Sequence, residues 1–161
     1  LRKPWVSFNI GAMVPNGDLA VGYDSSVQLA GSYMVATGKD FNVGLEISKS
    51  FVGGSALSST SFTNESSSLS SALVIFQKFF GDYMFLEGGG GIFRPKVTVE
   101  SIDQVKTSYS STHFGLAAGA GFFIPTSPYA GFTMKGRLNN YFDDSNKHYF
   151  GISGGFRFKI R

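Results

Sequence analysis

The chain has 161 residues, enough for one domain, and only 16% of them are charged, against roughly 25% in an average soluble protein. Aromatic residues also reach 16%, mostly as Phe, and the absence of cysteine excludes disulfides, thiol chemistry and cysteine-type zinc sites. The basic residues behind the formal net charge of +3 are scattered, which argues against nucleic-acid binding. No apolar run approaches the ~18 residues of a transmembrane helix, so a helical membrane protein is excluded.

Eight segments of the chain alternate apolar and polar residues with a period of two, the pattern of β-strands with two unlike faces. Each segment is long enough to cross a bilayer as a tilted strand, for which about 9–11 residues suffice. In chain order the segments are residues 5–14, 27–36, 41–51, 69–80, 83–97, 112–124, 129–141 and 149–160.

The last two segments show the contrast between faces most clearly. In the final one, Phe156 and Phe158 lie on one face, and Arg157 lies on the other. Neighbouring strands with aromatics on one face and cations on the other suit a barrel that is polar inside and apolar outside, as in membrane-spanning barrels. Segments 69–80 and 112–124 have the weakest contrast, and the sequence of 69–80 leaves open which of its sides faces lipid.

The connections alternate in length along the chain. Short turns are expected at residues 37–40, 81–82 and 125–128, and longer polar loops at 15–26, 52–68, 98–111 and 142–148. Outer-membrane barrels combine short periplasmic turns with longer extracellular loops, and an even strand number lets the first strand pair with the last. The sequence therefore predicts an all-β fold, an eight-stranded antiparallel up-and-down transmembrane β-barrel in which residues 1–161 form a single domain.

Five charged residues have apolar neighbours and are expected to face the lumen, because a cation on the lipid side at mid-membrane costs about 2–4 kcal/mol. An eight-stranded barrel is just wide enough for side chains to fill it. We therefore expect a salt-bridge network that plugs the lumen, with a gated solute path and a catalytic carboxylate pair as alternatives. Glu46 should lie near Lys135 or Arg137, and Glu87 near Arg157. The polar residues assigned to the same interior are Asn9, Gln28, Asn42 and Ser153.

A second cationic group is expected near the extracellular end. By register, Lys49 and Arg94 share the lipid-facing row with apolar residues, and Lys96 follows Arg94 by two positions. These side chains could meet the phosphates of lipopolysaccharide in the outer leaflet. The alternative is that they extend to water along the apolar surface.

The sequence offers few groups for catalysis. Its two histidines, His113 and His148, stand at the loop ends of strands, and neither belongs to a motif with a Ser and an acid. We therefore expect no enzyme activity, no metal site and no cofactor. The run Gly88–Gly91 precedes no helix, so it is not a phosphate-binding loop, and we expect it to relieve crowding in a small barrel.

The strand number, the alternating connections and the terminal segment Gly154–Ile160 together resemble the small outer-membrane barrels of the OmpA/OmpX type. The resemblance implies a location in the bacterial outer membrane and a lumen network of the kind formed by Glu46, Glu87, Lys135, Arg137 and Arg157. Members of that family usually end on an aromatic residue, whereas here Phe158 is followed by Lys159, Ile160 and Arg161. Because the chain starts at Leu1 rather than Met, we expect an export signal to have been removed.

The fold alone does not fix the function. We expect a non-enzymatic outer-membrane barrel with a structural or surface-interaction role, or one that is a subunit of a larger envelope assembly. Its expected partners are outer-membrane lipid and lipopolysaccharide, or a protein bound through the long loops or the outer wall. A narrow channel for small polar solutes or ions is the alternative. A soluble carrier with an apolar lumen is disfavoured, because Lys135, Arg137 and Arg157 lie opposite the apolar faces.

Overall fold

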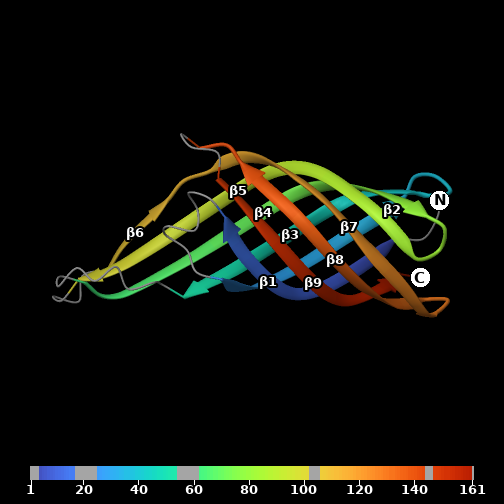
Figure 1. Cartoon of the computed structure of the whole chain (residues 1–161), viewed down its shortest axis with the longest axis horizontal. Helices are drawn as coiled ribbons and strands as arrows, with labels where there is room; N and C mark the ends of the chain where they lie inside the picture. The colour runs from blue at the N-terminus through green and yellow to red at the C-terminus, as the bar shows by residue number, and fades with distance from the viewer. Residues whose placement is uncertain (1–3, 17–24, 54–61, 102–105, 144–146, 161) are drawn as a thin grey trace.

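The computed structural model describes residues 4–16, 25–53, 62–101, 106–143 and 147–160, and these form one antiparallel sheet rolled into a closed barrel (Figure 1). Within this described part, no helix is long and apolar enough to cross a membrane. The strands are β1 (Trp5–Asn16), β2 (Ser26–Ala36), β3 (Phe41–Gly53), β4 (Phe62–Phe80), β5 (Met84–Ser101), β6 (Lys106–Ser110), β7 (His113–Ser127), β8 (Ala130–Tyr141) and β9 (Lys147–Lys159).

Eight of these strands make the barrel wall, which confirms the predicted fold class. Each of the eight pairs with the strands before and after it in the chain, except that β5 pairs directly with β7 in the wall, because β6 lies outside it. The pairing of β1 with β9, from Trp5↔Lys159 to Asn16↔His148, closes the barrel. Both ends of the chain lie at the end of the barrel where the short turns are (Figure 1). At one of these turns Gly81 has φ +68°, a left-handed conformation that glycine adopts without steric cost.

All four predicted long loops are partly strand, and the expected bounds were most wrong for 52–68 and 98–111. β4 begins at Phe62 rather than near residue 69, and its pairing with β5 continues to Ser101. β6 then pairs with β5 from Lys96↔Ser110 to Glu100↔Lys106. A backbone ladder needs no apolar face, so strands that run beyond an apolar belt lose the sequence contrast by which they are recognised. Of the four predicted loops, residues 17–24, 54–61, 102–105 and 144–146 lie outside the described residues.

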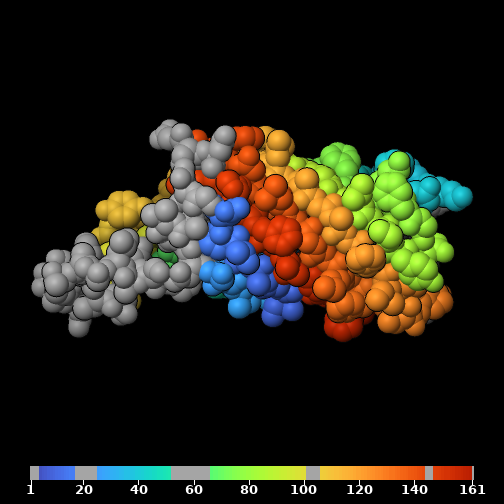
Figure 2. Space-filling view, viewed as in Figure 1, coloured from blue at the N-terminus to red at the C-terminus, as the bar shows by residue number. Residues whose placement is uncertain are grey.

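The outer wall is apolar, as the alternation predicted. Seven side chains on the apolar faces of the strands point outward and are well exposed, namely Phe8, Ile10, Leu45, Ile47, Leu138, Ile152 and Phe156. Phe132 is half-buried and packs edge-on against Phe156, with ring centroids 5.9 Å apart. In Figure 2 the surfaces of β1, β9, β8 and β7 adjoin one another, and β6 (gold) projects past them. An exposed apolar surface of this extent is suited to lipid rather than water.

The structure also assigns the faces of β4, which the sequence left open. Leu73, Ile75 and Gln77 point inward and are buried, whereas Val74 and Phe76 point outward. Opposite them, Gly88–Gly91 lie within β5 and form part of the wall. A Cβ on Gly89 would collide with the backbone oxygen of Val74 and would lie 2.8 Å from Ile75 Cδ1, so glycine at this position lets the backbones of β4 and β5 approach closely.

The interior has three levels along the barrel axis. Towards the long-loop end it is filled by apolar and aromatic side chains, among which Phe93 stacks on Tyr141 with centroids 5.6 Å apart. The middle holds charged residues, and the short-turn end opens into a recess. The polar exterior and apolar lumen of a soluble carrier are therefore excluded.

Candidate functional site

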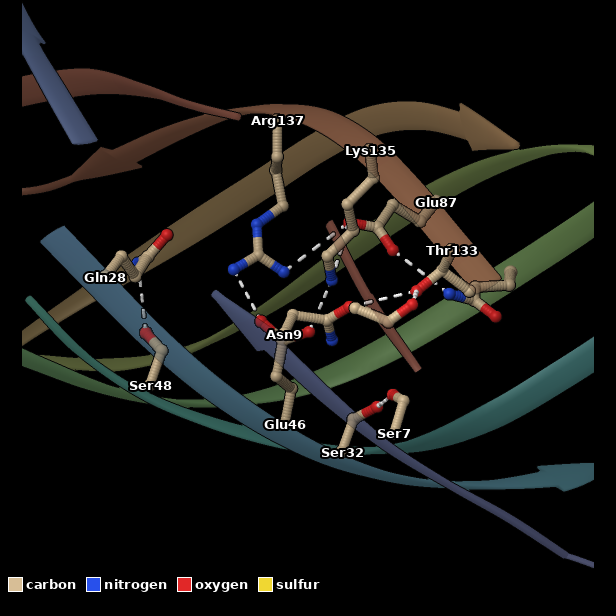
Figure 3. A network of polar contacts seen from close by, with 12 residues as sticks. Ser7, Asn9, Gln28, Ser32, Glu46, Ser48, Glu87, Thr133, Lys135 and Arg137 are labelled. Atoms are coloured by element: carbon tan, nitrogen blue, oxygen red, sulfur yellow. Dashed lines mark hydrogen bonds and ion pairs between the residues drawn. The ribbon is translucent and has the colours of Figure 1, made fainter. Parts of the chain in front are cut away.

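The middle of the lumen holds four of the predicted charged residues, which come from three strands. Glu46 lies on β3, Glu87 on β5, and Lys135 and Arg137 on β8, and their side chains converge on the barrel axis (Figure 3). The alternation places them there. Glu46 is 2% exposed, while its outward-facing neighbours Leu45 and Ile47 are 62% and 68% exposed.

These four side chains form a closed ionic square. Lys135 Nζ lies 2.6 Å from Glu46 Oε2 and 3.5 Å from Glu87 Oε1. Arg137 Nη2 lies 2.5 Å from Glu46 Oε1, and its Nη1 lies 3.5 Å from Glu87 Oε1. Each cation thus contacts both carboxylates. Two negative and two positive charges balance, as buried charges require if their desolvation is to be offset.

Neutral polar side chains surround this square and fill the remaining space. Thr133 Oγ1 donates to Asn9 Oδ1 at 2.9 Å, and Gln28 Nε2 donates to Ser48 Oγ at 3.2 Å (Figure 3). A cavity beside the square, lined in part by Asn9 and Lys135, has a volume of only about 10 Å³. A single water needs at least roughly that volume, so the lumen is closed at this level.

Arg157 lies apart from the ionic square. No carboxylate of the described residues lies within the 4 Å of an ion pair with it, so the expected direct contact with Glu87 is not made. Instead, Gln77 stands between them: Arg157 Nη1 donates to Gln77 Oε1 at 3.2 Å, and Gln77 Nε2 donates to Glu87 Oε2 at 3.1 Å. Sequence reasoning missed Gln77 because both faces of segment 69–80 are rich in apolar residues.

The predicted outer cationic group lies where the side chains of the outer wall change from apolar to cationic. The cross-strand row Ile47, Ala72 and Ile92 is apolar and exposed. One step further towards the long loops, the next outward row contains Lys49, Ser70 and Arg94. Such a change from apolar to cationic side chains is expected at the upper boundary of a membrane.

The members of this outer group, Lys49, Arg94 and Lys96, are all exposed. Lys49 and Arg94 lie two strands apart, about 10 Å at ordinary strand spacing. Lys49 Nζ sits over the ring of Phe51 at 5.2 Å, and Arg94 Nη2 donates to Ser110 Oγ of β6 at 3.3 Å. Lys96 is paired in register with Ser68 and Ser110.

His113 is not isolated, contrary to the expectation from sequence. Its Nε2 lies 2.6 Å from Ser111 Oγ, and its Nδ1 lies 3.8 Å from Asp143 Oδ1. The residue types are those of a hydrolytic triad, but 3.8 Å is too long for a hydrogen bond and Asp143 also pairs with Lys147 at 3.1 Å. The contacts join the start of β7 to the connection between β8 and β9, which no local motif could have shown. His148, by contrast, is paired in register with Asn16 and Asn140.

The fold is that of the small eight-stranded outer-membrane β-barrels. Ail, the attachment invasion locus protein of Yersinia pestis, matches with a TM-score of 0.69 at 20% identity, over 98% of this chain and 100% of that one. The N-terminal β-barrel domain of OprF from Pseudomonas aeruginosa matches with a TM-score of 0.63 at 14% identity, over 98% and 100% of the two chains. Neisserial surface protein A matches with a TM-score of 0.61 at 12% identity, over 98% and 97%.

At these identities the likeness establishes the fold and not a shared activity. No protein-family model and no curated protein sequence matches the chain. The function therefore has to be argued from the residues themselves.

Proposed function

We propose that residues 1–161 form a single β-barrel domain of the bacterial outer membrane, without enzyme activity, that has a structural or surface-interaction role, alone or as a subunit of a larger envelope assembly. The observation that carries this proposal is the outline of the wall. Its apolar belt gives way to the row of Lys49 and Arg94, beyond which β4 and β5 continue as a paired, polar extension flanked by β6. Polar segments held on a rigid scaffold are the usual carriers of recognition.

The filled lumen favours this role over a narrow channel for polar solutes or ions. The ionic square crosses the barrel, and the aromatic cluster of Phe93, Tyr141 and Tyr149 lies between it and the long-loop end. Conduction would require both layers to rearrange. A structural barrel needs no such movement.

The partners we propose are outer-membrane lipid and lipopolysaccharide at the outer cationic group, and a protein partner at the loops in 15–26, 52–68, 98–111 and 142–148 or at the outer wall. Lys49, Arg94 and Lys96 lie just beyond the apolar belt, which supports a contact between them and lipid phosphates. Ail has been solved both in a phospholipid bilayer nanodisc and in complex with a heparin analogue, sucrose octasulfate. Those structures support the idea that a barrel of this fold meets lipid and polyanions.

The test compares the thermal stability of the purified barrel in nanodiscs with and without lipopolysaccharide. We expect lipopolysaccharide to raise the melting temperature of the parent barrel. In the triple variant Lys49→Gln, Arg94→Gln, Lys96→Gln, this rise should shrink by more than half, because each cation near an anionic surface contributes on the order of 1 kcal/mol to binding. Lys78→Gln is a matched control. Lys78 is also exposed on the outer wall and lies over the rings of Phe41 and Phe80 at 5.6 and 5.2 Å, but at the short-turn end.

Equal loss of the lipopolysaccharide effect in Lys78→Gln and in the triple variant would contradict the assigned orientation. No effect of lipopolysaccharide on the parent barrel would remove lipid contact from the proposal.

A further inference from the structure

The short-turn end of the lumen opens into a recess of about 660 Å³. Arg157 lines it from β9, and the aromatic rings of Trp5, Phe79 and Phe123 line it from β1, β4 and β7. Lys159 lies at its rim, two positions beyond Arg157 on the same face of β9. All of these residues belong to the described part of the chain.

Arg157 is a buried cation whose charge is not neutralised. It is 3% exposed, and its partners are neutral: Gln77 at 3.2 Å and the Asn42 amide, which accepts from Arg157 Nη2 at 3.0 Å when oriented to satisfy its neighbours. The two lumen carboxylates, Glu46 and Glu87, are already balanced by the two cations of the ionic square. Arg157 therefore leaves the described interior with one positive charge that no buried carboxylate balances.

The aromatic rings lessen the cost of burying Arg157 but do not supply a counter-charge. The Arg157 Cζ lies 5.1 Å from the Trp5 ring centre, 5.5 Å from that of Phe79 and 5.7 Å from that of Phe123. Cation–π contacts of this kind stabilise a desolvated guanidinium. They leave the net positive charge of the guanidinium uncompensated, beside the recess that Arg157 lines.

A second cation is held at the same ring. Lys159 Nζ lies 5.5 Å from the centre of the Trp5 ring, so one indole has two cations near it. Two like charges repel, and an anion bound near both would relieve that repulsion. The acids of the rim, Asp40 and Asp82, are exposed on the turns, where water and salt screen them more than they screen the buried floor.

We propose that the recess at the short-turn end is a binding site for a small oxyanion, a phosphate or a carboxylate, held by Arg157 at the floor and by Lys159 at the rim. The planar guanidinium can present two parallel donors to either group, which a lysine cannot do. Phe79 and Phe123 give the site a low dielectric, in which a charge-assisted hydrogen bond is stronger than in water. The site lies at the opposite end of the barrel from the outer cationic group, so it does not depend on the proposed surface role.

The chain contains a natural probe of this recess, because Trp5 is its one tryptophan. The experiment titrates the purified barrel in nanodiscs with sodium phosphate and, separately, sodium acetate, with sodium chloride holding the ionic strength constant. We follow Trp5 emission and the single indole N–H resonance. Both should change along a saturable curve for at least one of the two anions. Saturation by phosphate alone assigns the site to phosphates, and saturation by acetate alone assigns it to carboxylates.

Three variants test which residues hold the anion. Arg157→Met should weaken the apparent affinity about tenfold or more, and Lys159→Gln about two- to threefold, because the second cation is more exposed. Lys78→Gln is the matched control, since Lys78 neighbours Phe79 in sequence but points to the outer wall, and it should leave the curve unchanged.

A response that rises linearly without saturation, or one that Arg157→Met and Lys159→Gln leave unaltered, overturns the proposal. Because Lys159 lies at the rim, its variant decides the question even if Arg157→Met does not fold.

Discussion

Two sets of buried cations in this barrel are satisfied in opposite ways. Lys135 and Arg137 each contact both lumen carboxylates, so the middle of the barrel is electrically closed. Arg157 is as deeply buried, yet it is surrounded by neutral groups and faces an open recess. This difference teaches that burial alone does not distinguish a buried charge with a structural role from one that a ligand can reach. The two kinds are distinguished by the partners of the charge and by the open space beside it.

The largest effect should come from removing the cations of the closed set. In the double variant Lys135→Ala, Arg137→Ala, Glu46 and Glu87 would be left as buried carboxylates without counter-charges, and breaking a buried pair in this way typically costs about 3–5 kcal/mol. We expect a marked fall in the free energy of unfolding, measured in detergent with urea, and a rise in conductance across planar bilayers. An unchanged melting temperature together with unchanged conductance would show that the square does not hold the lumen closed.

Much of this closed set follows from the sequence, because lipid outside and packed side chains inside impose a strict alternation on each strand. Glu46, Glu87, Lys135 and Arg137 could therefore be assigned to the lumen from their apolar neighbours. Which partner each would choose could not be assigned with the same certainty. That choice depends on the relative heights of strands distant in the chain, which are set by register and barrel closure.

The features that sequence reasoning missed share a physical cause. Gln77 lies in a segment whose two faces are both rich in apolar residues, and β6 lies beyond the apolar belt, so neither carries a contrast between faces. The recess is lined by residues of six strands that meet only when the barrel closes. Local periodicity does not report on any of these contacts.

A smaller effect on stability is expected for Arg157→Met, although it removes an equally buried charge. No carboxylate of the described residues depends on Arg157 for its counter-charge, so the change removes two hydrogen bonds, to Gln77 and Asn42, and the cation–π contacts with the three aromatic rings. The gain from no longer burying a cation should offset that loss, and we expect the free energy of unfolding to change by less than about 1 kcal/mol. A loss as large as that of the Lys135 and Arg137 variant would place Arg157 in the structural set. The same urea titration measures both.

The smallest effect is expected at the partly exposed cluster of Ser111, His113 and Asp143, the third place where charges meet. Here solvent screens the charges, and the His113–Asp143 separation of 3.8 Å is longer than a hydrogen bond. Asp143 is also held by Lys147 at 3.1 Å, which competes for the carboxylate that would orient a catalytic imidazole. We therefore expect His113→Ala to change the free energy of unfolding by less than about 1 kcal/mol.

The purified barrel should neither hydrolyse nor transfer acyl chains, with or without the His113→Ala substitution, and His148→Ala serves as the matched histidine control. Release of fatty acid from phospholipid or lipopolysaccharide by the parent barrel, abolished by His113→Ala and retained by His148→Ala, would show that the 2.6 Å contact between His113 and Ser111 belongs to an active site.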